Sequence, residues 1–278
     1  MFENNLNKEF LEFYEVYKKR PIDVNDGGMK MPHMFGLYCF IKKINPKFII
    51  ESGTFKGQSS WLMEQITDAK ILTIDLYKYD LLHNSKNITY SNLDFRFHDL
   101  SDFPIDETLL VFDDHVNAYE RFVHGRFWKF KHFIFEDNYP SNRGNTPSFK
   151  QFYNKSYDGW GKKRLKKIPL KDWTINYIKN ILRAILARKT IHPELNEPNN
   201  IKYDANIINQ TISKLPINYY EFPQLIKCNK SRWGTNWIDT YGNEDICLVK
   251  EELSDEIIKE IEKELKDYTS IAYLKIDN

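Results

Sequence analysis

The sequence predicts an α/β protein with a Rossmann-like, doubly wound and mostly parallel sheet. From residue 47 onward, short apolar runs of strand length alternate with stretches of helical length. The first of these runs ends in a glycine-rich turn, and later runs end in acidic residues. Alternating strands and helices favour parallel βαβ units, whose ligands bind beyond the carboxyl ends of the strands. N-terminal helices and a large insertion after the fifth strand complete the expected architecture.

Two helices are expected ahead of the first strand. Residues 5–20 carry apolar side chains at helical spacing, and Pro21 ends this pattern. A loop is expected over 22–30, and a second helix over 32–43, which stops before Pro46. Residues 1–45 are therefore predicted to form a helical extension.

Residues 46–150 are predicted to form the cofactor-binding core. Its strands are short apolar runs bounded by polar residues, which is typical of buried parallel strands. We expect strands at 47–52, 70–75, 93–97, 108–113 and 131–136, and helices at 57–66, 77–84 and 116–128.

The rest of the chain divides into an insertion over 151–240 and a C-terminal part over 241–278 that completes the sheet. The stretch 138–160 is rich in Asn, Ser, Gly and Pro, and its length indicates a substrate loop or lid. A loop and a short helix are expected over 190–216. The C-terminal part is expected to hold strands at 245–250 and 271–276 and a helix at 254–267 capped by Ser254.

Residues 161–189 form a strongly basic segment, with ten Lys or Arg residues against one acid, Asp172. Its second half has an apolar helical face. Such a helix can pack on its own domain with solvated lysines, or can dock a membrane surface, a phosphorylated substrate or a partner subunit. The aromatic segment 232–237 can line a sugar-binding cleft or anchor a loop.

Composition limits the classes of partner. The chain has 278 residues, 41% of them hydrophobic and 28% charged, with a formal net charge of +1. A chain-wide electrostatic grip on nucleic acid is therefore not expected. No apolar run approaches the roughly 18 residues of a membrane span, and the N-terminus does not read as a signal sequence. The three cysteines are scattered, so we expect a reducing, cytoplasmic setting.

The first predicted strand leads into ESGTFKGQSS, residues 51–60. Gly53 lets the backbone turn sharply and approach a ligand without a Cβ atom. Gly57 and Ser59 open the next helix, whose N-terminal end favours a carboxylate. With Glu51 before them, these residues match an adenosyl-binding turn. An ordinary βα turn with two incidental glycines is the alternative.

The second and third strand ends supply further candidates. Asp75 ends the run ILTID, 22 residues after Gly53, where an acid can accept both ribose hydroxyls of a nucleotide. A helix-capping role is the alternative for Asp75. His98 and Asp99 follow the third run, at a suitable position to contact an adenine, although solvated loop residues are equally consistent with the pattern.

The fourth and fifth strand ends carry clustered acids. The fourth ends in Phe112-Asp113-Asp114-His115, and the fifth in Glu136-Asp137-Asn138. Carboxylates at adjacent strand ends repel each other unless a positive charge lies between them. Oxygen ligands of this kind suit Mg²⁺, Mn²⁺ or Ca²⁺. Surface acids that cap the next helices are the alternative.

ESGTFKGQSS, ILTID, FDDH and FEDN, in this order, resemble class I S-adenosylmethionine-dependent methyltransferases over roughly residues 45–150. They are most similar to metal-dependent small-molecule O-methyltransferases. Asp114-His115 and Asp137-Asn138 match the catechol and caffeoyl-CoA type. Glu136-Asp137 matches the cephalosporin hydroxylase-like and macrolide-sugar group equally well. The resemblance implies Asp114 and Asp137 as metal ligands, with Glu136 or Asn138 as the third.

The chain departs from the catechol type at one position. That type carries a catalytic Lys three residues after the fourth-strand Asp, where this chain has Asn117. His115 is then the candidate base, because a neutral imidazole takes a proton near pH 7. A His that caps the next helix or bonds a ligand carboxylate is the alternative.

These patterns together predict an enzyme, an O-methyltransferase that uses S-adenosylmethionine and a divalent cation, Mg²⁺ or Mn²⁺. Asp114 and His115 are its expected catalytic residues, and the acceptor is expected to be a hydroxyl of a small molecule or glycan. Nucleic acid is disfavoured as a substrate because FDDH lacks the motif of DNA and RNA amino-methyltransferases. A homo-oligomer is possible. A hydroxylase-like enzyme that does not transfer methyl groups and a non-catalytic cofactor-binding protein are the alternatives.

Overall fold

The computed structural model describes residues 1–2, 6–77, 79–141, 143–144, 146–156, 205–241, 253–265 and 268–277. The chain divides into two compact units, Met1–Gln151 with Leu215–Asn278, and Phe152–Lys214. The larger unit carries the sheet. Along the described chain the elements are α1 (Asn7–Tyr17), α2 (Met31–Ile44), β1 (Phe48–Ser52), α3 (Gln58–Ile66), β2 (Lys70–Ile74), β3 (Ile88–Ser91), β4 (Thr108–Phe112), α4 (Ala118–Phe127), β5 (His132–Phe135), α5 (Phe149–Tyr153), α8 (Ala205–Ser213), β6 (Ile217–Glu221), α9 (Trp237–Tyr241), α10 (Asp255–Leu265) and β7 (Ala272–Ile276).

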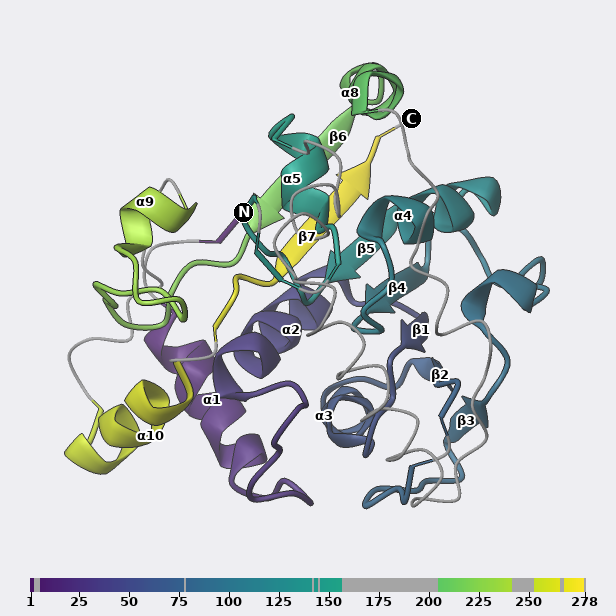
Figure 1. Cartoon of the computed structure of the whole chain (residues 1–278). Coiled ribbons are helices and arrows are strands. Elements are labelled where there is room, and N and C mark those ends of the chain that lie inside the picture. Colours follow the sequence, from purple (N-terminus) through teal and green to yellow (C-terminus); the bar gives the residue numbers. More distant parts are fainter. Residues whose placement is uncertain are drawn as a thin grey trace, which may run out of the picture. The chain divides into compact units, whose positions relative to one another are not determined.

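The sheet has seven strands in the order β3-β2-β1-β4-β5-β7-β6 (Figure 1). The first five strands pair in parallel, whereas β7 runs antiparallel to both β5 and β6. The predicted Rossmann-like, doubly wound and mostly parallel sheet is confirmed. The strand order reverses between β1 and β4, and such a switch point opens a crevice at the carboxyl ends of the two strands.

One face of the sheet packs against α1, α2 and α3. The middle helix α2 is apolar on nearly all sides, and its residues Met31 to Ile41 are buried. Helix α1 adds aromatic side chains to this layer, with the Phe10 and Phe35 rings 5.2 Å apart. The outer face of α1 meets α10 through hydrogen bonds from the Tyr14 and Tyr17 hydroxyls to glutamates of α10. The N-terminal helices therefore belong to the main core.

The opposite face packs against α4 and the start of α5. Phe122 of α4 lies 5.5 Å from the ring of Phe133 on β5 and 5.3 Å from Phe149. Gly125 brings α4 down onto the strands, since a Cβ atom there would lie 2.5 Å from Phe133 and 2.6 Å from Leu110. This close fit places the N-terminal end of α4 beside the carboxyl ends of β4 and β5.

Two of the expected elements are wrong. The third strand is Ile88–Ser91, and the expected strand at 93–97 holds instead a 3-10 helix over Phe95–Phe97. Asp94 causes this turn, because its side chain accepts from the backbone N–H of Arg96. The helix expected over 77–84 is absent from the described residues of that stretch, which form an irregular loop. The backbone of Leu82 there donates to the Lys56 carbonyl.

The sequence pattern did not predict β6, although it pairs with β7 over five residues. The strand expected at 245–250 and the basic segment 161–189 lie outside the described residues. The domain boundaries expected within the chain remain predictions.

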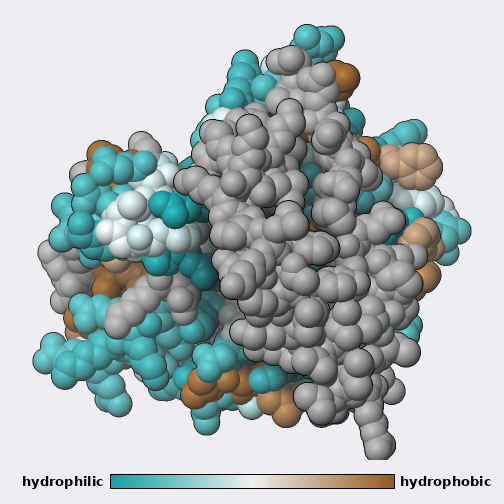
Figure 2. Space-filling model, in the orientation of Figure 1, coloured by the Kyte–Doolittle hydropathy of each residue, from teal (hydrophilic) through white to brown (hydrophobic). Residues whose placement is uncertain are grey.

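The described part of the chain contains no helix with the length and apolar character needed to cross a membrane. Figure 2 shows that hydrophilic residues cover most of the visible described surface on one face, with hydrophobic residues in small separate groups. Among the described large hydrophobic residues, the largest exposed fraction is 76%, for Phe127 at the end of α4.

Gly125→Ala should destabilise the protein, because the added methyl group has no space between α4 and the sheet. Overpacking of this kind costs about 1–3 kcal/mol in the free energy of unfolding, measurable by urea denaturation. Val123→Ala on the exposed side of the same helix is the matched control and should change the free energy of unfolding by less than about 0.5 kcal/mol. Equal effects of the two substitutions would contradict the packing described for α4.

Candidate active site

The turn after β1 has a backbone that only glycine adopts without strain. Gly53 has φ +111°, and a Cβ atom there would lie 2.1 Å from the carbonyl oxygen of Asp113. Gly57, with φ +87°, is the residue that precedes α3. The two glycines therefore shape a tight turn at the switch point, and Gly53 lies directly against the chain that leaves β4.

Glu51 supports this turn from inside the sheet. Its side chain is fully buried, and its Oε2 atom accepts hydrogen bonds from the hydroxyls of Ser60 and Thr73. Burial raises the pKa of Glu51, although these hydroxyls and that of Ser59 partly offset the rise. The acid thus joins β1, β2 and α3 through hydrogen bonds.

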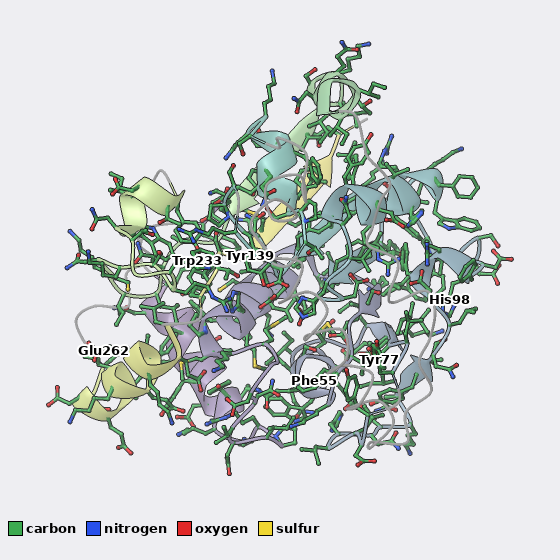
Figure 3. All side chains as sticks on the ribbon, in the orientation of Figure 1. Phe55, Tyr77, His98, Tyr139, Trp233 and Glu262 are labelled. Carbon is green, nitrogen blue, oxygen red and sulfur yellow. The ribbon has the colours of Figure 1, made fainter. Side chains whose placement is uncertain are left out.

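Asp75 lies beside the glycine turn, as the sequence predicted. One carboxylate oxygen accepts from the backbone N–H of Phe55 at 2.8 Å, and the other from that of Tyr77 at 3.0 Å. Figure 3 shows Phe55 and Tyr77 in the same region of the molecule. Tyr79 adds a ring 4.9 Å from that of Phe55. Asp75 therefore binds together two loops whose aromatic side chains border the turn.

His98 and Asp99 make local contacts in the loop after β3. The His98 ring lies 3.0 Å from the Ser91 hydroxyl and 3.1 Å from the Leu93 carbonyl. Asp99 accepts from the backbone N–H of Ser101 and is exposed. These contacts stabilise the loop itself, so a contact of either residue with a nucleotide base remains a prediction.

Asp113, His115 and Asp137 form the candidate metal centre. They follow β4 and β5, and each offers a ligand atom within 4.8 Å of the others. The Nδ1 atom of His115 lies 2.7 Å from Oδ2 of Asp137. Parallel strands end at the same edge of the sheet, so the backbone delivers these three side chains to one place.

The electrostatics of this centre indicate an excess of negative charge. Burial, followed by the nearby charge of Asp137, raises the pKa of Asp113 well above its usual range. Burial and the charge of Asp113 do the same to Glu136. The hydrogen bond to Asp137 raises the pKa of His115 to about 9. Although burial acts in the opposite direction, pairing with His115 lowers the pKa of Asp137. In the metal-free protein, protons bound to these side chains therefore offset part of the negative charge that a bound cation would neutralise.

Glu136 and Asn138, the two expected candidates for a third ligand, differ in their surroundings. Glu136 is buried beside Asp113, and its Oε1 atom lies 3.4 Å from Nδ1 of His33 on α2. The Nε2 atom of His33 accepts from the backbone N–H of Thr269, so the proton of a neutral ring is on Nδ1, facing Glu136.

Asn138 is engaged on the side of β6 and α5. Its amide nitrogen donates to the Tyr219 hydroxyl at 2.6 Å, and its amide oxygen accepts from the backbone N–H of Lys150 at 3.0 Å. The side chain is fully buried. Asn138 therefore secures the loop after β5. The described contacts bring Glu136, rather than Asn138, to Asp113 and Asp137, and we call these three carboxylates the acidic cluster.

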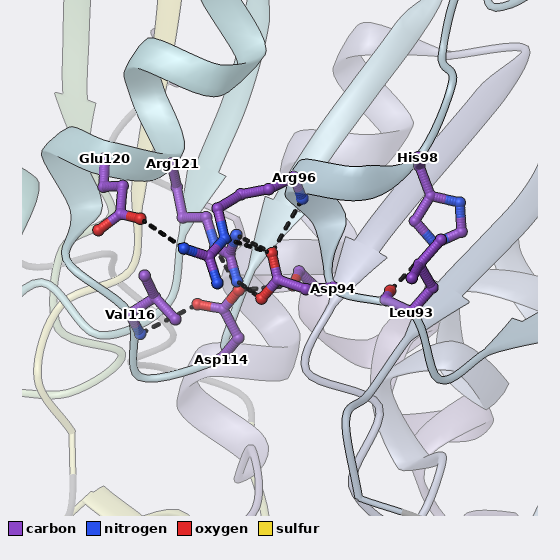
Figure 4. Close-up of polar contacts among 9 residues, drawn as sticks. Leu93, Asp94, Arg96, His98, Asp114, Val116, Glu120 and Arg121 are labelled. Atoms are coloured by element: carbon purple, nitrogen blue, oxygen red, sulfur yellow. Dashed lines mark hydrogen bonds and ion pairs between the residues drawn. The ribbon is translucent and has the colours of Figure 1, made fainter. Parts of the chain in front are cut away.

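Asp114 lies in a separate network centred on Arg121 (Figure 4). The Nε atom of Arg121 donates to Oδ2 of Asp114 at 2.7 Å, and the Ser52 hydroxyl donates to the same oxygen at 2.5 Å. The two terminal nitrogens of Arg121 donate to the carboxylate of Asp94, each at 3.1 Å. The structure thus differs from the expected ligand pair: Asp113, rather than Asp114, faces Asp137.

Sequence reasoning missed Asp113 as a ligand candidate and Arg121 altogether. Asp113 adjoins Asp114, so the acidic pair marks the strand end that carries the cluster, and the structure places Asp113 rather than Asp114 next to Asp137. Arg121 carries no motif, and its side chain is only 2% exposed. A cation buried to this extent needs carboxylate partners, but the sequence does not say which ones.

The donor set fits a divalent cation. Two carboxylates with one imidazole, and a buried third carboxylate beside them, suit Mg²⁺ or Mn²⁺, and the imidazole also admits Zn²⁺ or Fe²⁺. The glycine turn lies at the switch point between β1 and β4, where the crevice of such a sheet opens. The arrangement can therefore hold a nucleotide-like molecule at the ends of β1 and β2 and a cation at the ends of β4 and β5.

No known protein family and no curated protein matches this sequence. Solved structures similar to the chain include CmcI in a Mg-SAM form, at 21% identity and a TM-score of 0.31 over 44% of this chain and 64% of that one. TomG from Streptomyces achromogenes, an O-methyltransferase of tomaymycin synthesis in complex with SAM, has 9% identity and a TM-score of 0.42, covering 98% and 90% of the two chains. An O-methyltransferase from Bacillus cereus in complex with SAH has 9% identity and a TM-score of 0.44, covering 97% and 91%. The chain thus spans less than two thirds of the length of CmcI.

Arg121→Met should destabilise the protein strongly, because it leaves Asp94 and Asp114 without their cation. Breaking a buried pair in this way costs about 3–5 kcal/mol in the free energy of unfolding, measurable by urea denaturation at pH 7. The matched control is Arg96→Met. Its side chain is 40% exposed and also contacts Asp94, and its loss should cost about 1 kcal/mol or less.

The effect of Arg121→Met should depend on pH. Despite its burial, the pairing with Arg121 lowers the pKa of Asp94. A lowered pKa contributes stability above the unfolded value of about 3.9, and this contribution is lost as the pH falls through the folded value. The difference between wild type and Arg121→Met should therefore shrink as the pH is lowered below about 4. A difference that stays constant down to pH 2.5 would contradict the pairing.

Proposed function

We propose that this protein is an O-methyltransferase that uses S-adenosylmethionine and a divalent cation, Mg²⁺ or Mn²⁺, to methylate a hydroxyl of a small molecule or glycan. One observation carries the proposal. The glycine turn that would hold the cofactor touches the backbone of Asp113, the residue that opens the acidic cluster. A cofactor on the turn and an acceptor on the cluster would then be neighbours, and methyl transfer requires such proximity.

The cofactor side of this proposal consists of residues from three strand ends. Gly53 and Gly57 give the turn its positive-φ backbone and let it pack against the Asp113 and His83 carbonyls, and Glu51 with Ser59 supports the turn. Asp75 would accept the ribose hydroxyls, while His98 and Asp99 would border the adenine. When bound, S-adenosylmethionine supplies an electrophilic methyl group.

On the other side, Asp113 and Asp137 would hold the cation, with Glu136 as the third carboxylate. A bound Mg²⁺ or Mn²⁺ supplies a Lewis acid that stabilises the acceptor oxygen as an anion. Asp114 and Asn138 keep the two loops in position through Arg121 and Tyr219.

His115 is the group that we assign to the proton of the acceptor hydroxyl. Its Nδ1 atom faces Asp137, so the opposite nitrogen, Nε2, is the one assigned to this exchange. Pairing with Asp137 keeps the ring protonated near pH 7 in the metal-free protein. Neutralising the charge of Asp137 would lower the pKa of His115 toward the range in which a neutral imidazole accepts a proton, because this pairing is the main cause of the raised pKa.

Cofactor binding is the first test. Titration calorimetry should show that the wild-type chain binds S-adenosylhomocysteine. Asp75→Asn should weaken this binding by about 1.5–3 kcal/mol, through loss of hydrogen bonds to a charged acceptor. Asp80→Asn removes an exposed charge from the same loop and should leave the affinity unchanged. A wild-type chain without measurable affinity would rule out the methyltransferase and leave the fold unaffected.

Metal binding is the second test. Mn²⁺ or Mg²⁺ should raise the melting temperature, because a cation that binds only the folded state stabilises it by mass action. Asp113→Asn and Asp137→Asn should abolish this increase. Asp114→Asn should lower the melting temperature of the metal-free protein but retain the increase, and so should distinguish the two neighbouring acids.

Asp102→Asn, an exposed acid outside the cluster, is the control for this experiment and should behave as wild type. If Asp114→Asn abolishes the increase and Asp113→Asn does not, the ligand assignment is wrong. Methyl transfer that survives EDTA would exclude the cation and leave His115 as a simple base. Cofactor binding without methyl transfer to any hydroxyl acceptor would favour a binding protein or a hydroxylase-like enzyme.

A further inference from the structure

Two arginines and two aromatic residues gather beside the acidic cluster. Tyr139 and Arg143 lie in the loop after β5, and Arg232 and Trp233 lie between β6 and α9. The guanidinium carbons of Arg143 and Arg232 lie 5.6 Å and 5.7 Å from the centre of the Trp233 ring. The Tyr139 ring lies 6.2 Å from Trp233 at an interplanar angle of 67°, and Figure 3 shows the two residues close together. We call these four residues the arginine–tryptophan cluster.

The backbone holds the cluster in shape. Gly144, with φ +79°, lies so close to the Tyr139 ring that a Cβ atom there would be 1.9 Å from it. The Ser148 hydroxyl and the Gln151 amide both donate to the Tyr139 carbonyl. On the other loop, a tight turn joins the backbone N–H of Ser231 to the Thr235 carbonyl at 2.8 Å. The aromatic platform is therefore preformed.

The arginine–tryptophan cluster is connected to the acidic cluster through Tyr139. Tyr139 shares a hydrogen bond with Asp137, the carboxylate that also pairs with His115. The positive charge of Arg232 acts on the Tyr139 hydroxyl, where it partly offsets the rise in pKa that burial causes. A molecule that reaches Asp137 from this side therefore meets positive charge next to it.

The arginines also differ from the buried Arg121. Both Arg143 and Arg232 are exposed, and no described carboxylate lies within 4.0 Å of Arg143. A guanidinium group is planar, and its N–H donors form a fork that matches the oxygens of a carboxylate or phosphate. Contact with an aromatic ring face helps to hold this fork in place.

We propose that the arginine–tryptophan cluster binds an oxyanion of the acceptor, so that the substrate of this site is a hydroxyl compound carrying a carboxylate, phosphate or sulfate. That the bound molecule is a methyl acceptor rests on the proposed function, whereas the oxyanion site itself is inferred from the geometry of the cluster. A neutral sugar offers no anionic oxygen to the N–H donors of the two arginines. An acidic sugar would offer such an oxygen and would place its hydroxyls toward Asp137.

The experiment measures the tryptophan fluorescence of the full chain during titration at constant ionic strength. The probes are D-glucuronate, D-glucose 6-phosphate and neutral D-glucose. Both anions, or one of them, should give a saturable change that is absent in Trp233→Phe, and D-glucose should give none. The anion that responds identifies the oxyanion that the cluster prefers.

Arg143→Gln and Arg232→Gln should each weaken anion binding about three- to tenfold. Lys227→Gln removes an exposed positive charge from the segment that carries Trp233 without touching the ring, and should bind as wild type. Arg232→Lys keeps the charge but loses the planar fork, and should recover only part of the affinity. Circular dichroism of each variant checks that the fold is intact.

An equal response to D-glucose and the two anions, or an equal loss of affinity in Lys227→Gln, would overturn the proposal. Titration of the same proteins with S-adenosylhomocysteine separates the two proposals. Anion binding without cofactor binding would refute the methyltransferase and support the oxyanion site. Cofactor binding without any anion response would refute the oxyanion site alone.

Discussion

The buried guanidinium of Arg121 is the interaction on which the arrangement of the strand ends depends. A buried cation is tolerated only when carboxylates surround it, and here the partners come from the loops after β3 and β4. Ser52 at the end of β1 joins the same network through Asp114. Helix α4, which carries Arg121, is itself held close to the sheet at Gly125. One side chain thus sets the positions of three neighbouring segments around the switch point.

The same constraint decides which acid reaches the candidate metal centre. Successive side chains of an extended chain point to opposite sides. With Asp114 held by Arg121, the Asp113 side chain is turned toward Asp137, which follows β5, while the Asp113 backbone carbonyl lies against Gly53. His115 follows with φ +56°, a conformation uncommon for a residue other than glycine, and this bend brings its ring back to Asp137. The acidic cluster is therefore assembled by a network that contributes no ligand to it.

How much could be predicted depended on the kind of evidence. The strands β1, β2, β4 and β5 were predictable because each is an apolar run that ends in polar residues. The turn after β1 was predictable because it contains two glycines, and both adopt the positive φ that glycine allows. The expected strand at 93–97 failed because the Asp94 side chain accepts hydrogen bonds from the backbone N–H of Arg96 and from the Arg121 side chain, interactions that outweigh the apolar residues beside it. Strand β6 was missed because Ile217–Glu221 lacks a clear alternation, and pairing with β7 supplies its order.

The sequence by itself determined the fold class and the strand ends at which chemistry is expected, because apolar periodicity and glycine positions are local properties of the chain. Only the tertiary structure placed Asp113 rather than Asp114, and Glu136 rather than Asn138, at the acidic cluster, because these positions depend on partners distant in sequence. Arg121 holds Asp114, and Tyr219 with Lys150 holds Asn138. The tertiary structure also brought Arg143 and Arg232 to the indole ring of Trp233, from loops about 90 residues apart. A buried charge or amide must find its partner in space, and no spacing along the chain records where that partner lies.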